Sequence, residues 1–381
     1  MKKLFFFAAA ALALASCSND ETIAQYQGEA ISFQTFVGGT TRAADITTSN
    51  ISEFTVEAFN AGATTSPYFT NVQFTKQSTD PVTFTSATKY YWPASGSLDF
   101  YAYSPTTNAQ ISKTDYKTFT VTPSTTVSEQ VDLVYACTKG KSKTTTNGVA
   151  GAIALNFRHA GSKIVVKVKN TAPNLKFEVS GWKVGYLDNT ATFTYADANT
   201  DTQNSAQLAI GDWSDNTTYA AANTYSVTTT SANAVAASAS SAQYLGASAL
   251  SATETEGLNM ILIPQSPSAA TEYATTEENA APNGSYIALK LKIFNNTTAA
   301  EVVADATTKW AMWPVAFNWV PGKKYTYTID LADGGYWETN TNDSNKDLDP
   351  ILEGAVIKFV DVTVDNWSAA EDVDVPAIVN P

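Results

Sequence analysis

The chain contains 381 residues, of which 44% are hydrophobic and 15% charged, and its formal charge at pH 7 is −13. This acidic balance argues against nucleic acid as a partner, because binding to phosphate backbones needs clustered lysines and arginines. Strand-forming Thr, Val, Tyr, Phe and Trp are abundant, and the length fits two domains of ordinary size. We therefore predict an all-β protein with two units.

Residues 1–16 have the pattern of a lipoprotein signal peptide. Two lysines precede an apolar run over residues 4–15, which is shorter than the roughly 20 residues of a membrane-spanning helix. Leu14-Ala15-Ser16-Cys17 has the form that a lipoprotein signal peptidase recognises. We expect Cys17 to be acylated and to become the first residue, so that lipid alone holds the chain to a membrane.

Cys137 is the other cysteine of the chain. Once Cys17 is acylated, Cys137 can form no intramolecular disulfide. We predict that it is a small buried apolar side chain.

Residues 17–42 are predicted to be a lipidated propeptide that contains the first strand. Ile31, Phe33 and Val37 lie on one alternating face, which is expected to complete a buried sheet. The sequence predicts that this strand is provisional and is later removed.

A short segment of glycines and small polar residues, 38–44, follows the first strand. Such a segment is flexible enough for a protease to bind. Of the two arginines in the chain, Arg158 falls in a predicted strand, which leaves Arg42 as the accessible one. We predict cleavage after Arg42, with Ala43 as the new N-terminus.

Residues 43–138 are predicted to form an N-terminal β-sandwich, because short alternating runs are separated by turn residues. The expected strands are 54–59, 82–84, 89–93, 98–103 and 131–136. Residues 139–150 are polar without apolar periodicity and are predicted to be a linker.

Residues 151–367 are predicted to form a second β-sandwich. The expected strands are 153–157, 163–169, 177–179, 192–195, 260–264, 286–293, 325–331 and 360–365. Residues 219–257 are mostly Ala, Ser and Thr, so we expect weakly packed arms or loops there. A tail, residues 368–381, ends the chain.

Catalytic motifs are not found in the sequence. The single histidine, His159, has no nucleophile motif beside it, and there is no phosphate-binding loop, nucleophile elbow or CxxC pair. We predict a protein that is not an enzyme and has no cofactor. The many Trp and Tyr residues could stack on sugars, but most lie in alternating strands, where core packing is the ordinary role.

An acidic loop contains Asp343, Asn345, Asp347 and Asp349, in the spacing that begins a calcium loop. The glycine and the bidentate glutamate of such a loop are missing at the required positions. A solvated loop is therefore favoured over a calcium site, and no metal is predicted.

Several short motifs resemble, in their order and spacing, those of the fimbrillins, the major and accessory subunits of type V pili in Gram-negative anaerobes. The resemblance covers essentially the whole chain. Besides the lipobox at Cys17, the motifs are Thr41-Arg42-Ala43, Trp92 with residues 100–105, and residues 132–136, 155–164, 322–325 and 362–367.

The resemblance implies two tandem transthyretin-like β-sandwiches. It also implies export as a lipoprotein precursor to the cell outer membrane and surface, held by lipid on Cys17. An arginine-specific protease would then process the precursor at Arg42, and other pilin subunits would join it head to tail in an adhesive fimbrium.

Removal of the first strand would leave an apolar groove and unpaired backbone groups, which a donated strand can fill. The tail is the expected donor through Val373, Val375 and Ile378. Head-to-tail exchange does not close, so it gives a filament. The alternative is a surface lipoprotein that does not polymerise, such as a glycan-binding module or a tip or anchor adhesin.

Overall fold

A computed structural model gives the structure of this chain. It describes residues 29–37, 50–78, 82–145, 151–196, 211–214, 218–254, 258–302, 310–341, 344–352 and 361–367. These residues form strands, turns and short 3-10 helices, with no α-helix among them, which confirms the all-β class. Within the same residues, no helix has the length and apolar character needed to cross a membrane.

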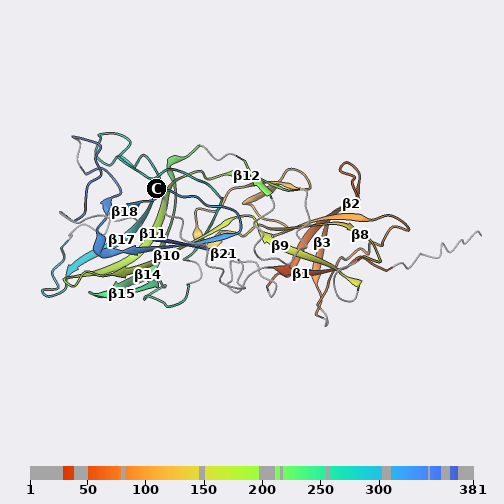
Figure 1. Cartoon of the computed structure of the whole chain (residues 1–381), viewed down its shortest axis with the longest axis horizontal. Coiled ribbons are helices and arrows are strands. Elements are labelled where there is room, and N and C mark those ends of the chain that lie inside the picture. Colours follow the sequence, from red (N-terminus) through yellow and green to blue (C-terminus); the bar gives the residue numbers. More distant parts are fainter. Residues whose placement is uncertain are drawn as a thin grey trace, which may run out of the picture.

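Two groups of sheets follow one another along the long axis of the molecule, with β1, β2, β3, β8 and β9 near one end (Figure 1). The first group is built on a closed barrel with the strand order β1-β4-β3-β2-β5-β8-β9. Its strands are β1 (Phe33–Val37), β2 (Glu53–Asn60), β3 (Pro67–Lys76), β4 (Phe84–Thr85), β5 (Leu98–Ser104), β8 (Val134–Lys141) and β9 (Ile153–His159).

A four-stranded sheet in the order β13-β12-β7-β6 accompanies this barrel. It consists of β6 (Ile111–Lys113), β7 (Thr118–Val121), β12 (Ala191–Tyr195) and β13 (Gly211–Trp213), and the 3-10 helix η1 (Val127–Glu129) follows β7.

The barrel strands have apolar residues on both faces. On β5, Phe100 belongs to the core inside the barrel, whereas Tyr101 and Tyr103 belong to a second core shared with Phe119 and Phe193 of the four-stranded sheet. Every residue of β5 is therefore buried. Cys137 lies in the second core, is fully buried and forms no disulfide with a described residue, which confirms the prediction of a buried apolar side chain.

The second group consists of two further sheets, with the orders β15-β10-β19-β21, where β16 also pairs with β10, and β14-β11-β17-β18-β20. The first of them contains β10 (Ser162–Asn170), β15 (Ala239–Tyr244), β16 (Met260–Leu262), β19 (Lys323–Asp330) and β21 (Asp361–Asn366). The second contains β11 (Leu175–Leu187), β14 (Ala220–Val235), β17 (Tyr286–Asn295), β18 (Ala311–Pro314) and β20 (Tyr336–Trp337), and the 3-10 helix η3 (Leu331–Asp333) follows β19.

The alternating valines and isoleucines of β10 explain how these two sheets share one core. Ile164, Val166 and Val168 point from β10 into a cluster that also contains Trp182 of β11 and Leu289 of β17. Lys163, Lys167 and Lys169 occupy alternate positions on β10 and point away from this core, as period-two alternation requires. Burial of each such side chain stabilises the fold by about 1.5–3 kcal/mol.

The pairing of β9 corrects one expectation from the sequence. We expect residues 153–157 to open the second unit, yet β9 pairs with β1 and β8 and completes the barrel. Residues 139–141 of the expected linker are likewise the end of β8. The boundaries of the two units as a whole stay a prediction.

The segment rich in Ala, Ser and Thr corrects a second expectation. Instead of arms or loops, residues 220–235 form the long strand β14, which pairs antiparallel with β11, and residues 239–244 form β15. Both strands lie at the edge of a sheet. An edge strand is held by ladder hydrogen bonds and needs few large apolar side chains. The amino-acid composition of these segments therefore did not predict β14 and β15.

Candidate functional site

The first strand closes the barrel. β1 runs parallel to β9, from Phe33 opposite Ile153 to Val37 opposite Phe157, and Phe33 also pairs antiparallel with Phe84 of β4. Before the strand, Ile31 N donates to Tyr90 O over 2.8 Å, and Ile153 N donates to Ser32 O over 2.9 Å. The backbone of this segment is therefore bonded to both neighbours, and without β1 the barrel would be open between β4 and β9.

The side chains of the first strand fill the centre of the barrel. Phe33 is fully buried, and its ring meets those of Phe74, Phe100 and Phe54 edge-on at centroid distances of 4.7, 5.3 and 5.9 Å. Edge-on aromatic pairs add about 0.5–1.5 kcal/mol each beyond the burial of area. Ile31 is also buried. The structure thus describes a first strand with Ile31 and Phe33 inside; its displacement stays a prediction.

The remaining predicted site residues lie outside the described part of the chain. These are Cys17, Arg42, Ala43, Val373, Val375 and Ile378. The strand β1 ends shortly before Arg42, and β21 ends shortly before the predicted donor tail.

The last strand belongs to the second group of sheets. β21 pairs antiparallel with β19, and Val362 and Val364 pack against the core between the two sheets. Trp367 N then donates to Gly322 O over 2.9 Å. The buried Trp367 ring lies at the junction with the barrel, where it stacks on His159.

His159 ends β9 and is buried at this junction. Its Nδ1 lies 2.7 Å from Oδ2 of the buried Asp132. The imidazole is thus enclosed between a carboxylate and an indole. This arrangement positions β9 against β21, and it supports the structural role expected for His159.

Arg158 lies in the paired part of β9, opposite Tyr135 of β8. Burial lowers the pKa of its guanidinium, although the nearby Tyr135 opposes the shift. A protease must bind an extended segment, so we expect the pairing of β9 to protect Arg158 from cleavage.

The acidic loop before β21 uses the carboxylate of Asp349 within the loop, and Asp343 lies outside the described residues. Asp349 Oδ2 accepts from Thr341 N and Thr341 Oγ1 at 2.9 and 2.6 Å. Asn345 Oδ1 accepts from the backbone of Asp347. Among the residues that the structure places, no three His, Cys, Asp or Glu side chains are grouped as a metal site.

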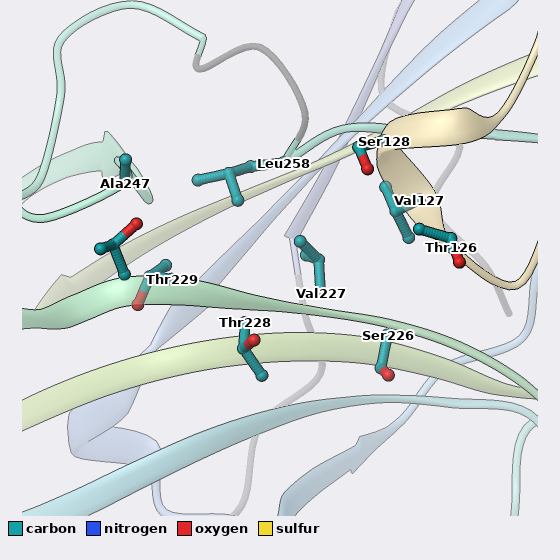
Figure 2. A pocket seen from close by; sticks show the side chains of 10 residues that line it. Thr126, Val127, Ser128, Ser226, Val227, Thr228, Thr229, Ala247 and Leu258 are labelled. Atoms are coloured by element: carbon teal, nitrogen blue, oxygen red, sulfur yellow. The ribbon is translucent and has the colours of Figure 1, made fainter.

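A pocket of about 310 Å³, which we call the junction pocket, lies between η1 and the edge strand β14. Figure 2 shows Val227 of β14, Leu258 and Val127 of η1 around its centre. Thr126 forms a parallel bridge to Ser226, so the pocket lies where the two groups of sheets meet. The sequence did not predict this pocket, because its lining residues come from segments that are far apart in the sequence.

The fold defines a class of all-β protein in which the N-terminal strand closes a barrel. A sequence profile described as fimbrillin-like matches residues 41–367. The chain belongs to the fimbrillin-like family. The match begins after β1 and ends at Trp367, so it leaves out both the first strand and the tail.

Solved structures with a similar fold include proteins from Bacteroides species. A fimbrial protein from Bacteroides vulgatus is 16% identical, with a TM-score of 0.51, and the alignment covers 88% of this chain and 99% of that one. A candidate cell adhesion protein from Bacteroides uniformis is 18% identical with a TM-score of 0.41, covering 89% and 98% of the two chains. No curated protein sequence matches the chain.

Proposed function

We propose that this protein is a structural subunit of a cell-surface fimbrium and supports adhesion. The observation that carries the proposal is β1, which closes the barrel parallel to β9 with Phe33 at its centre. Family membership supports the same function. The role is mechanical and not enzymatic, and it needs no cofactor.

Removal of β1 would make the barrel ready to accept another strand. The rings of Phe54, Phe74 and Phe100 would lose their contact with Phe33, and the edges of β4 and β9 would lose a hydrogen-bonded neighbour. Unpaired edges and exposed apolar grooves are unfavourable in water. A strand donated by another subunit restores both the ladder and the burial.

Processing at two places would control this exchange. Lipid on Cys17 would hold the precursor at the outer membrane, where the intact first strand blocks polymerisation. Cleavage between Arg42 and Ala43 by an arginine-specific protease would then remove the lipid and the strand together.

The tail, residues 368–381, would be the donated strand. Val373, Val375 and Ile378 offer apolar side chains for the groove. The groove and the donor belong to opposite ends of the chain, so every subunit accepts one strand and donates one, and the contact is head to tail. In this proposal the two groups of sheets are two tandem transthyretin-like sandwiches, and β9 belongs to the first of them.

The proposal is tested by removing the tail. A chain that ends at residue 367 should fold, be cleaved after Arg42 and stay monomeric, whereas the full-length chain should form sodium dodecyl sulfate-resistant ladders on a gel. The matched control is Val362→Asp, which places a charge in the core of the second group and should prevent folding itself. Ladders from the truncated chain would overturn the donor assignment.

N-terminal sequencing of surface-purified protein tests the processing step independently. An N-terminus at Ala43 supports the exchange. An acylated Cys17 at the N-terminus of all mature protein would instead favour the alternative of a lipid-anchored adhesin or glycan-binding module.

A further inference from the structure

A second pocket lies on the side of the barrel, under the β6–β7 hairpin, and we call it the Glu57 pocket. Its volume is about 440 Å³, within the range of about 300–1,000 Å³ that small-molecule sites occupy. It is lined by Glu57, Asn71, Tyr103, Lys113, Thr114, Asp115 and Tyr116. These residues come from β2, β3, β5, β6 and the turn after β6.

A buried carboxylate is the first notable feature of this pocket. The Glu57 side chain is only 6% exposed, and its neighbours on β2 are apolar core residues. Burial of a charge is costly unless it is paired. Lys113 Nζ of β6 donates to Glu57 Oε1. Within the described residues this is the one hydrogen bond of the carboxylate, so Oε2 is available to a ligand.

A β-bulge brings an amide to the same place. Between Val56 opposite Val72 and Ala58 opposite Phe69, β3 carries one residue more than β2. Asn71 in this bulge has a backbone φ of 51°, a positive value that residues other than glycine rarely adopt. Bulges often redirect a side chain next to a functional site. Here Asn71 Oδ1 accepts from Lys113 Nζ over 2.5 Å, which leaves both amide hydrogens of Asn71 for a ligand.

Two aromatic side chains complete the pocket. Lys113 Nζ lies 5.4 Å from the ring centroid of Tyr103, and Tyr116 lines the pocket from the turn between β6 and β7. Burial raises the pKa of Tyr103, and the Glu57 carboxylate adds to this, so its phenol stays neutral. The pocket therefore combines polar groups with aromatic surface.

The chemistry of these groups selects a neutral ligand with many hydroxyls. Lys113 keeps a third N–H, Asn71 keeps its amide hydrogens, and Glu57 and Asp115 offer carboxylate oxygens. Among the lining residues two carboxylates accompany one ammonium, which disfavours an anion, although Lys117 Nζ lies 5.6 Å from the ring centroid of Tyr116. We propose that the Glu57 pocket binds a neutral sugar residue of a glycan. This inference does not depend on strand exchange, because no lining residue belongs to β1 or to the tail.

Saturation-transfer NMR on the full chain tests the proposal. The probes are the methyl glycosides of glucose, galactose, mannose, fucose, N-acetylglucosamine and N-acetylgalactosamine. At least one should receive saturation, and its affinity is then measured by titration. Asn71→Gly, which suits the positive φ, and Glu57→Gln, which keeps the shape, should each weaken binding about tenfold or more, as loss of a hydrogen bond to a charged or polar group predicts.

The matched control is Ser128→Ala, which changes the hydroxyl-lined junction pocket and should leave affinity unchanged. Thermal unfolding shows whether each variant is folded. If Glu57→Gln does not fold, the affinity of Asn71→Gly alone tests the proposal. The proposal is overturned if no glycoside receives saturation, if folded Asn71→Gly binds as the native chain does, or if only Ser128→Ala weakens binding.

Discussion

His159 stacks face to face on Trp367, with ring centroids 4.2 Å apart and planes inclined by 13°. The first residue ends β9 of the barrel, and the second follows β21 of the second group. Nearby, Trp213 Nε1 donates to Ala160 O over 2.9 Å. The barrel wall that pairs with β1 is therefore packed directly against the segment from which the tail departs.

Trp367→Ala should destabilise the protein. The buried indole of Trp367 covers the ring of His159 and lies close to Gly161. Removal of the indole therefore leaves a cavity at the junction. Truncation of a buried Trp costs about 3–5 kcal/mol. Urea denaturation measures this change. The exposed Tyr68→Ala is the control and should cost about 1 kcal/mol or less; equal effects would mean that the stack contributes nothing specific.

An arginine-specific protease should cut the folded precursor at Arg42 and spare Arg158. The backbone of Arg158 is paired in β9, whereas the sequence around Arg42 consists of small and glycine residues. Mass spectrometry of a time course should show one new N-terminus, at Ala43. Arg42→Gln should abolish this product without creating another. Early cleavage after Arg158 would contradict the protection by β9.

Phe33→Ala should affect the precursor and the processed chain differently. In the precursor, loss of a fully buried phenylalanine ring should lower the free energy of unfolding by about 3–5 kcal/mol. After cleavage at Arg42 the strand is expected to leave, so variant and native chains should then unfold alike.

Phe74→Ala is the matched control for this comparison, because Phe74 contacts the same ring but belongs to β3 and stays in the barrel. It should destabilise both forms. A Phe33→Ala effect that persists after cleavage would show that the cut strand remains bound.

Alternation of apolar and polar residues in the sequence predicted the strands that have one clearly apolar face. Ile164, Val166 and Val168 revealed β10, and Ile31 with Phe33 revealed β1. The long β14 was missed because its Ala, Ser and Thr residues lie at a sheet edge and carry little apolar pattern.

The bulge at Asn71 explains why β3 was also missed. Strict alternation would place Phe69 and Phe74 on opposite faces of the strand, because their residue numbers differ by an odd number. Both nevertheless point into the barrel, so period-two alternation fails between them. The same bulge creates the Glu57 pocket. Glu57, Asn71 and Lys113 come from three strands, and no local sequence pattern links them. A pocket of this kind becomes visible only when pairing and register are known.

Glu254 should make the second group of sheets sensitive to acid. Its carboxylate lies 3.1 Å from Lys163 Nζ of β10 and 3.1 Å from Lys324 Nζ of β19, two residues that are opposite each other in the ladder. Burial alone would raise the pKa of Glu254, but the two ammonium groups outweigh it and hold the pKa below its ordinary value of 4.5.

A carboxyl group whose pKa is lower in the folded than in the unfolded state stabilises the fold above the unfolded value. This contribution is fully present at pH 7 and is lost as the pH falls below 4.5 through the folded pKa. Glu254→Gln should therefore lower the free energy of unfolding at pH 7 by about 1–3 kcal/mol. The difference between native and variant chains should shrink as the pH falls toward 3, which urea denaturation at a series of pH values measures. Glu277→Gln, at an exposed turn, is the control and should change stability little at pH 7. A Glu254→Gln effect of the same size at every pH would show that packing, and not the charge pair with Lys163 and Lys324, accounts for the loss.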